Sequence, residues 1–419
     1  MNTLWPNLLS PLDQGDDSRC AVSAKGVRIR FADNEERLCM TSGLWNVPLG
    51  YGNKHIANAI AQAAKRLSYG GVFRYENIYA REAADTIVDV AGRDRYSRVL
   101  FSTGGGPAVD LALKLARQYQ ILIDEVQRRI VVGLQGSFHG LVMDSFPLTG
   151  EKLGQEVYGV DRRLVRHIPA NDVEALSKFM ERLGDQIAAV ILEPVAGSGT
   201  RPLTTEFIDA VLQARDEHGF LLIADEVATG FARTGPMFAS SKWSGAPDIM
   251  LLSKALSNGS CAISAVLVAA AVSAPFVKNN ATLAHAETAA GNSIATAAVT
   301  ATLEEMMRFD IVAAAARTSV LLDDCLRKLV SRVPGVEEFS GVGAFRTVHI
   351  SYLDGSPVSM ADVLAIVDTI RSNGVIVHPG VGGIQLVPAL VYTANDMAKA
   401  FNAISCGINA WRAAQPKER

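Results

Sequence analysis

The sequence predicts an α/β protein with a mainly parallel sheet flanked by helices, and three observations favour this class. Short apolar runs alternate along the chain with helical patterns of ten or more residues, which is typical of βαβ units. Residues 187–195 and 220–227 are almost continuously apolar, as expected of strands that are buried on both faces. Hydrophobic residues make up 49% of the chain and charged residues 20%, which indicates a folded globular protein.

The individual elements follow from the spacing of apolar residues. Helical spacing predicts helices at residues 55–67, 79–91, 107–127, 172–186, 206–219 and 291–310,. Pro107 suits the first turn of the long helix that it opens,. Apolar runs predict strands at residues 98–103, 130–135, 187–195 and 220–227, and a strand leading into a helix at 263–276,. After residue 310 the pattern changes to that of a smaller α+β unit, which places a domain boundary near residue 305.

Composition and charge exclude several classes of partner. The net charge is −3 and the basic residues are scattered, so no nucleic acid partner is expected,. No apolar window is long enough to span a bilayer, and the N-terminus lacks a basic segment followed by an apolar one,. The five cysteines have no metal-binding spacing, so we expect no metal, and their dispersed positions suit a reducing cytoplasm,. The sequence therefore predicts a cytoplasmic protein without a membrane or nucleic acid partner.

Chemically distinctive residues follow three of the predicted strands. The glycines at 104–106 precede a helix and suit an anion such as phosphate, although a plain turn is the alternative,. Lys254 follows an apolar run, where burial would make its amine nucleophilic; an ordinary lysine at a strand end is the alternative,. Asp225 ends an apolar strand, and a helix cap or a salt bridge would also explain it.

These three features gain weight because ligands of open parallel sheets bind beyond the carboxyl ends of strands. A phosphate cradle, a desolvated amine and a buried carboxylate are the parts that pyridoxal phosphate needs. The phosphate anchors the cofactor, the lysine forms a Schiff base, and the carboxylate keeps the pyridine nitrogen protonated. The sequence therefore predicts a pyridoxal-phosphate site at this edge of the sheet.

Four motifs also resemble those of the class III aminotransferases, which are pyridoxal-phosphate enzymes of fold type I. They are "LEPVAGSG" at 192–199, "LLIADEVATGFARTG" at 221–235, "LLSKALSNG" at 251–259 and "HAETAAGNSIATAA" at 285–298. Residues 43–45 and "LKLARQYQ" are most similar to the omega-aminotransferases and diaminopelargonic acid synthase. The resemblance implies a large cofactor-binding domain at 50–305 and a small domain formed by residues 1–49 and 306–419.

The resemblance also implies roles for residues around the cofactor ring. Lys254 matches the Schiff-base lysine, which also moves the proton between carbons. Asp225 matches the partner of the pyridine nitrogen. Val227 and Phe138 match the residues on the two ring faces.

Further matches concern the phosphate and the surroundings of the ring. Gly105 and Gly106 match the phosphate-binding amides. Thr288 matches a threonine that reaches the phosphate of the partner subunit, which implies a homodimer with shared sites. Glu193 matches the glutamate of a Glu-Pro pair near the cofactor. His139 accompanies Phe138 in the same motif, and a purely structural histidine is at least as good an explanation of it.

The chain departs from the family pattern at the phosphate and at the ring. The phosphate loop usually reads Ser-Gly-Ser-Glu, whereas residues 104–107 are Gly-Gly-Gly-Pro. Two hydroxyls and a carboxylate are therefore missing, and backbone amides must do most of the phosphate binding. Ala228 occupies a position that often carries a glutamine for the cofactor's 3′ oxygen.

The substrate side departs further. Leu141 stands where α-amino-acid-specific relatives often have an arginine, and Ser198 and Gln385 replace both members of a Glu–Arg gating pair. His378 occupies the place of a mobile arginine. Arg74 is a second candidate for carboxylate recognition, in the segment that lines the partner's pocket, with a surface salt bridge as the alternative.

Trp45 is expected to form a pocket wall, with a core aromatic as the alternative. These positions predict an aminotransferase whose aldehyde or ketone acceptor lacks an α-carboxylate, on a specialised metabolite or a modified peptide. Rival interpretations are an aminomutase of the same family and a catalytically silent relative. The His-Ala-Glu at 285–287 also matches the His-x-Glu of zinc deaminases, but the Pro-Cys-x-x-Cys partner motif is missing,.

Overall fold

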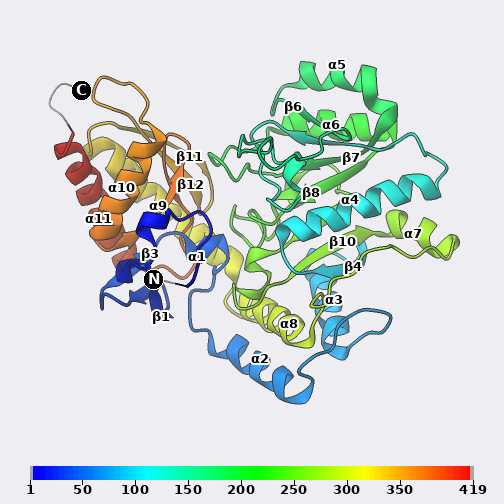
Figure 1. The fold of residues 1–419 in the computed structure, drawn as a ribbon, viewed down its shortest axis with the longest axis horizontal. Helices are drawn as coiled ribbons and strands as arrows, with labels where there is room; N and C mark the ends of the chain where they lie inside the picture. The colour runs from blue at the N-terminus through cyan, green and yellow to red at the C-terminus, as the bar shows by residue number, and fades with distance from the viewer. Residues whose placement is uncertain (1–2, 416–419) are drawn as a thin grey trace. The chain divides into compact units, whose positions relative to one another are not determined.

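The computed structural model describes residues 3–415 and divides into two compact units (Figure 1). The large unit contains Lys54–Ala316 and Gly341–Gly343. The small unit contains the chain up to Asn53, Arg317–Ser340 and the chain from Ala344 onward. Among the described residues, no helix is both long enough and apolar enough to cross a membrane.

The large unit is built around one seven-stranded sheet. Its strands are β4 (Tyr96–Ser102), β5 (Ile130–Leu134), β6 (Val165–Ile168), β7 (Ile187–Leu192), β8 (Leu221–Asp225), β9 (Ile249–Leu252) and β10 (Ser264–Ala269). Their order is β4-β10-β9-β8-β7-β5-β6. Only β10 runs antiparallel to its neighbours, because the ten or so residues after β9 leave no room for a crossover helix,. The predicted mainly parallel α/β fold is confirmed.

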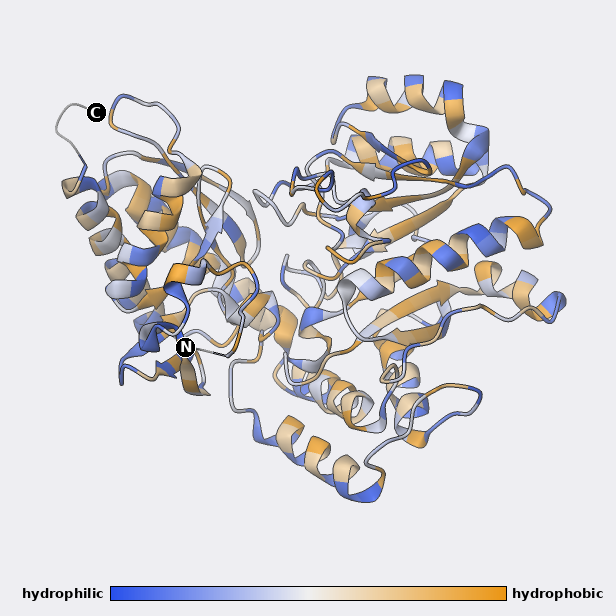
Figure 2. Cartoon of the chain, viewed as in Figure 1, coloured by the Kyte–Doolittle hydropathy of each residue, from blue (hydrophilic) through white to orange (hydrophobic). Residues whose placement is uncertain are grey.

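Helices cover both faces of this sheet. The helices of the large unit are α2 (Lys54–Arg66), α3 (Ile78–Ala91), α4 (Gly105–Leu122), α5 (Val173–Leu183), α6 (Thr205–His218), α7 (Ala270–Lys278) and α8 (Ser293–Arg308), with single turns η3 (Phe146–Leu148), η4 (Gly184–Gln186), η5 (Ala239–Lys242) and η6 (Lys254–Ser257). Of these, α8 packs against α2, α3 and η6. The strands are mostly hydrophobic, whereas α4 alternates between hydrophilic and hydrophobic residues (Figure 2).

Successive side chains of each strand point to opposite faces of the sheet, and each face packs against its own set of helices. Leu221 and Ile223 of β8 pack in one cluster with α4, while Leu222 packs in another with α5 and α6. Since successive strand side chains point to opposite faces, Asp225 is expected on the α4 side together with Leu221 and Ile223. Asp225, the last residue of β8, is thus expected to lie on the face of the sheet that α4 covers.

Three details differ from the sequence-based expectation. The helix predicted to begin at Pro107 begins at Gly105, capped by Gly104. The same helix ends at Leu122 rather than continuing to residue 127, because Asp124 adopts a left-handed backbone with φ of 66°,. Strand β6 was not predicted, since its four residues include Arg166 and His167.

The small unit contains two four-stranded sheets and three long helices. The sheets have the orders β1-β2-β3-β13 and β11-β12-β15-β14. Their strands are β1 (Ala21–Lys25), β2 (Arg28–Phe31), β3 (Glu36–Cys39), β11 (Val336–Val342), β12 (Phe345–Ile350), β13 (Val375–Ile376), β14 (His378–Gly380) and β15 (Gly383–Leu386). The helices and turns are η1 (Pro11–Asp13), η2 (Asp17–Arg19), α1 (Ser42–Trp45), α9 (Ile311–Arg332), α10 (Met360–Ser372) and α11 (Ala394–Ala413). The first residues of α9, up to Ala316, and the last two of β11 are counted with the large unit. One apolar core joins α9, α10 and α11 to these sheets.

Candidate active site

Five strands of the large unit end near predicted site residues. Gly105 and Gly106 follow β4, and Phe138 follows β5 after a short turn. Glu193 follows β7 directly, Asp225 is the last residue of β8, and Lys254 follows β9 after Ser253. Because β5, β7, β8 and β9 are mutually parallel, and β4 is antiparallel to β10 as β9 is, all five carboxyl ends lie at one edge.

Asp225 is almost completely buried, with 4% of its surface exposed. One carboxylate oxygen, Oδ2, lies 2.7 Å from Nδ1 of His139, and the other accepts the N–H of Val227 at 3.1 Å. Thus the carboxylate at the end of an apolar strand has an imidazole partner and a backbone donor. Both are contacts that a buried ionised carboxylate requires.

His139 is the side chain that contacts the buried carboxylate of Asp225. Burial alone would lower the pKa of its imidazole, but the hydrogen bond and the charge of Asp225 outweigh burial and raise it. Its Nε2 is buried without a hydrogen-bond partner among the described residues. The motif alone left a purely structural histidine as at least as good an explanation of His139, and its contact with Asp225 now places it beside a candidate cofactor residue.

Glu193 connects the segments after β5 and β7. Its Oε2 accepts the N–H of Phe138 at 2.9 Å and its Oε1 accepts the N–H of Gly197 at 3.0 Å. Burial raises the pKa of this carboxyl to about 7, although the charge of His139 opposes the rise. Glu193 therefore sets the backbone position of Phe138, the predicted ring-face aromatic.

Lys254 opens the single turn η6 with a φ of 41°, a strained value for a side chain with a Cβ,. Burial lowers the pKa of its amine to about 8, while the charges of Glu193 and Asp225 oppose this change. Arg233, which is 2% exposed, lowers the Lys254 pKa further. A lysine with this pKa has a substantial neutral fraction at physiological pH, as a nucleophilic amine must.

The glycine loop packs closely against its neighbours. A Cβ at Gly105 would lie 3.1 Å from Cγ1 of Val227, and one at Gly106 would lie 3.0 Å from Cγ2 of Val142. The first hydrogen bond of α4 runs from the N–H of Ala108 to the carbonyl of Gly104 at 3.0 Å. The N–H groups of Gly105 and Gly106 precede it, so they remain available to an anion.

Thr288 and Arg74 lie on exposed segments of the large unit. The carbonyl of Thr288 accepts the hydroxyl of Tyr69 at 2.9 Å, which fixes the segment that carries it. Within residues 3–415 Arg74 forms no ion pair, and its guanidinium lies 5.3 Å from the ring centroid of Phe73. The salt-bridge alternative for Arg74 is therefore not observed, while carboxylate binding stays a prediction.

The small unit brings together the other predicted substrate residues. The ring of Trp45 meets His378 edge-on at 5.6 Å and Phe345 at 5.2 Å. His378 lies opposite Gln385 in the β14–β15 ladder. The turn that carries Trp45 is strained, with φ of 46° at Ser42 and 66° at Trp45,. Its role as a pocket wall stays a prediction.

Three residues near the site were missed from the sequence. Arg233 is buried beside Lys254, Glu151 contacts Ser198, and Glu287 contacts the start of the phosphate loop. Arg233 lies within a quoted motif and Glu287 within another, so their positions were visible but their contacts were not. Glu151 lies 47 residues from Ser198, and no sequence pattern joins them.

The residues of this edge fit pyridoxal phosphate. Two glycine amides at a helix N-terminus suit its phosphate, Lys254 supplies a desolvated amine, and Asp225 supplies a buried carboxylate. A side chain at either glycine would press against a valine, Val227 or Val142. The fold and this set of groups are those of a fold type I pyridoxal-phosphate enzyme.

Comparison with known proteins identifies the family. The family model for aminotransferase class-III matches residues 12–408. The chain is 30% identical to acetylornithine aminotransferase of Methanothermobacter thermautotrophicus, over 91% of each chain. It is 30% identical to the enzyme of that name from Methanopyrus kandleri, over 78% of this chain and 80% of the relative. The chain therefore belongs to the class III aminotransferases, and it depends on pyridoxal phosphate.

Solved structures agree with this assignment. An amine transaminase from an uncultivated Pseudomonas species, solved with pyridoxal phosphate, is 27% identical, with a TM-score of 0.90 over 98% of this chain and 99% of the other. An (S)-enantioselective omega-transaminase from Thermomicrobium roseum has a TM-score of 0.92 at 23% identity, over 98% and 96% of the two chains. The second similarity concerns the fold alone.

Proposed function

We propose that this aminotransferase moves an amino group from a donor to an aldehyde or ketone acceptor that lacks an α-carboxylate. The acceptor would be a larger specialised metabolite or a modified peptide, and the enzyme would work in the cytoplasm as a homodimer with shared sites. The observation that carries the proposal is a carboxylate that the structure places against Ser198.

That carboxylate belongs to Glu151, which accepts the hydroxyl hydrogen of Ser198. Burial raises the pKa of Glu151, and the bond from Ser198 lowers it. Within residues 3–415, no lysine, arginine or histidine forms an ion pair with Glu151. The acid that some family members carry at position 198 is thus supplied from elsewhere in the chain, without the arginine that accompanies it in those members.

Glu151 is fixed close to the candidate cofactor residues. Its N–H donates to the carbonyl of Ser137 at 3.3 Å, and Ser137 precedes Phe138. Its hydroxyl partner Ser198 follows Gly197, which donates to Glu193. Glu151 therefore lies between the two segments that Glu193 connects.

An uncompensated carboxylate at this place disfavours a substrate carboxylate. Two like charges about 5 Å apart repel by about 3 kcal/mol at an effective dielectric constant of about 20, and partial exposure reduces this figure. Leu141, which is 45% exposed and apolar, offers no compensating charge. These features support an acceptor that is neutral, or that carries an amine, near the reacting carbon.

Different residues of the chain would move the proton, bind the ring nitrogen and position the ring of the cofactor. When bound, pyridoxal phosphate supplies an electron-withdrawing ring that makes a C–H bond of the substrate acidic. Lys254, with a pKa near 8, accepts and returns a proton at Nζ near neutral pH,. Asp225, in contact with His139, supplies a buried carboxylate that would bind the protonated ring nitrogen,. Val227 and Phe138 restrict the position of the ring.

The proposed homodimer draws on the exposed segments of the large unit. Phe73 and Tyr75 are 55% and 56% exposed, and they flank Arg74. The nearby carbonyl of Thr288 bonds to Tyr69, which is itself 48% exposed. Exposed aromatic side chains grouped in this way are typical of an interface. They support a dimer in which Arg74 and Thr288 reach the partner's site.

The proposal is tested with one amine donor and a panel of acceptors. We expect a higher kcat/KM for a neutral aldehyde or ketone than for pyruvate. Acetylornithine is included as a donor because the curated relatives carry its name. A strong preference for keto acids, or efficient turnover of acetylornithine with a keto acid, would refute the proposed acceptor. Absence of any visible absorption band after addition of pyridoxal phosphate would instead favour the catalytically silent alternative.

A further inference from the structure

The phosphate loop of this chain contains no side chain that orients it. Residues 104–107 are three glycines and a proline, so the loop has neither hydroxyl nor carboxylate. Glycine allows many backbone conformations, yet amides bind phosphate well only when they point in a fixed direction. Some other part of the chain must therefore fix this loop.

Glu287 contacts the residues that lead into the loop. Its Oε1 accepts the hydroxyl of Ser102, and its Oε2 accepts both the hydroxyl and the N–H of Thr103, the latter at 3.2 Å. Burial would raise the pKa of Glu287, but the bonds from Ser102, Thr103 and His285 together lower it. One carboxylate thus binds three donors immediately before Gly104.

The segment that carries Glu287, residues 283–290, also contacts α4, the helix that follows the glycine loop. His285 lies with Nε2 3.2 Å from Glu287 and Nδ1 3.7 Å from Asp110 of α4. Lys114 lies 3.4 Å from His285 and 3.0 Å from Asp110. The segment therefore spans both ends of the glycine loop, from Thr103 on one side to the first turns of α4 on the other.

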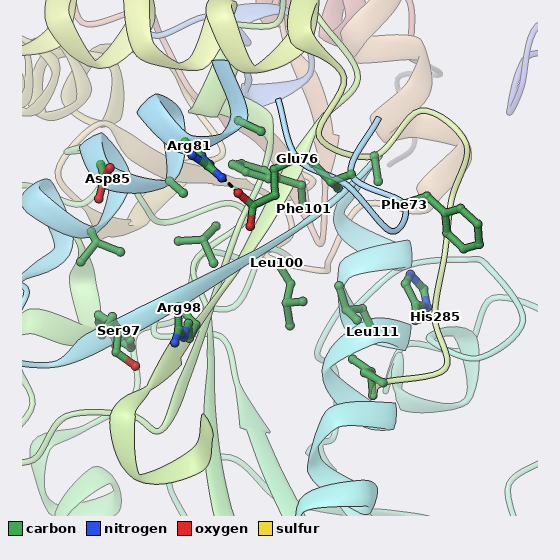
Figure 3. A pocket seen from close by; sticks show the side chains of 18 of the residues that line it. Phe73, Glu76, Arg81, Asp85, Ser97, Arg98, Leu100, Phe101, Leu111 and His285 are labelled. Carbon is green, nitrogen blue, oxygen red and sulfur yellow. Dashed lines mark hydrogen bonds and ion pairs between the residues drawn. The ribbon is translucent and has the colours of Figure 1, made fainter. Parts of the chain in front are cut away.

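Thr288 follows Glu287 directly, and its carbonyl is bound by Tyr69 at 2.9 Å. Glu287 and His285 also line a cavity of about 700 Å³ between α3, β4 and the 283–290 segment. Figure 3 shows His285 beside Leu111 of α4 in the wall of this cavity. The position of Thr288 is thus fixed by two sets of contacts. One is the hydrogen bonds of its neighbour Glu287 to Ser102 and Thr103, and the other is the hydrogen bond from Tyr69 to its own carbonyl.

We propose that Glu287 is a positioning residue that orients the amides of the glycine loop for the cofactor's phosphate. Because the next residue is Thr288, the same contact sets the position from which Thr288 would reach the partner's phosphate. This inference rests on the proposed function, since it takes the loop to be the phosphate site.

The test compares pyridoxal phosphate with pyridoxal, which lacks the phosphate. The affinity of the apoprotein for each is measured from the visible absorption band, for the natural chain, Glu287→Ala and Glu287→Gln. Glu76→Gln is the matched control, because Glu76 lines the same cavity but pairs with Arg81 on the surface.

We expect Glu287→Ala to weaken pyridoxal phosphate binding about tenfold or more and to leave pyridoxal binding within about twofold. The affinity of Glu287→Gln for pyridoxal phosphate should lie between those of the natural chain and Glu287→Ala, since an amide side chain accepts hydrogen bonds through one oxygen only. The sign of the change in affinity separates two explanations. If Glu287 acted only by its charge, removing that charge near a phosphate would strengthen pyridoxal phosphate binding rather than weaken it. Equal weakening for both ligands would show a merely structural role and overturn the inference, as would unchanged or stronger binding of pyridoxal phosphate.

Two other results need their own interpretation: a Glu287→Ala variant that does not fold, and a natural chain that does not bind the cofactor. If Glu287→Ala does not fold, Ser102→Ala combined with Thr103→Val removes the two hydroxyl donors from the other side and should give the same selective loss. If the natural chain binds neither ligand, or does not prefer the phosphorylated one, the phosphate site itself is refuted rather than the role of Glu287 within it.

Discussion

The lowered pKa of Lys254 predicts how quickly the apoprotein captures its cofactor at each pH. Only the neutral amine attacks an aldehyde, so the capture rate follows the neutral fraction of Lys254. The perturbation is therefore a change of pH, applied to the apoprotein in the presence of pyridoxal phosphate. Burial, the largest influence on this amine, makes the neutral form accessible near pH 8.

The magnitude follows from the pKa of about 8 against an ordinary value of 10.5. At pH 7 about one tenth of Lys254 is neutral, whereas an unperturbed lysine would be neutral in about one molecule in 3,000. The capture rate at pH 7 should therefore exceed that of an unperturbed amine by about 300-fold. It should rise about tenfold from pH 6 to 7 and level off above about pH 8.

Stopped-flow absorbance of the growing visible band measures this rate. Glu193→Gln is the informative variant, because the charge of Glu193 raises the Lys254 pKa. Its removal should move the plateau to lower pH and speed capture at pH 7. A rate that continues to climb to pH 10 in the natural chain would refute the buried, desolvated amine, and an unchanged plateau in Glu193→Gln would refute its coupling to Glu193.

The remaining predictions concern charges around the same site. Asp225→Asn should still bind pyridoxal phosphate but transaminate at least about a hundredfold more slowly, and near-normal turnover would contradict its assignment. Glu151→Gln should raise kcat/KM for pyruvate about tenfold relative to a neutral ketone; a fixed ratio would exclude charge as the selecting feature. Apoprotein stability should rise with pH between about 8 and 10.5, since the unfolded chain binds the extra proton at Lys254 in that window,. Urea unfolding of Lys254→Met should lack that rise, and an identical pH profile for both proteins would contradict it.

Local pattern was sufficient to predict most of the large unit. Strand β8 and helix α6 follow directly from apolar runs and helical spacing, because burial on both faces of a parallel sheet leaves a plain signature,. Strand β6 gave no such signature, since an edge strand with Arg166 and His167 is half polar. The end of α4 was missed because a single left-handed residue, Asp124, terminates the helix where the apolar spacing continues.

The sequence alone predicted the fold class, the cofactor and the strand ends that carry Gly105, Asp225 and Lys254, because βαβ topology brings such ends to one edge,. It did not predict what each group touches. Contacts such as His139 with Asp225, 86 residues apart, or Glu287 with Thr103, 184 residues apart, arise only when the packed sheet brings distant loops together. Position 198 illustrates the limit: its serine suggested that the charge was lost, whereas the tertiary structure places Glu151 against it. A carboxylate supplied from a distant loop leaves no trace at the position where it acts.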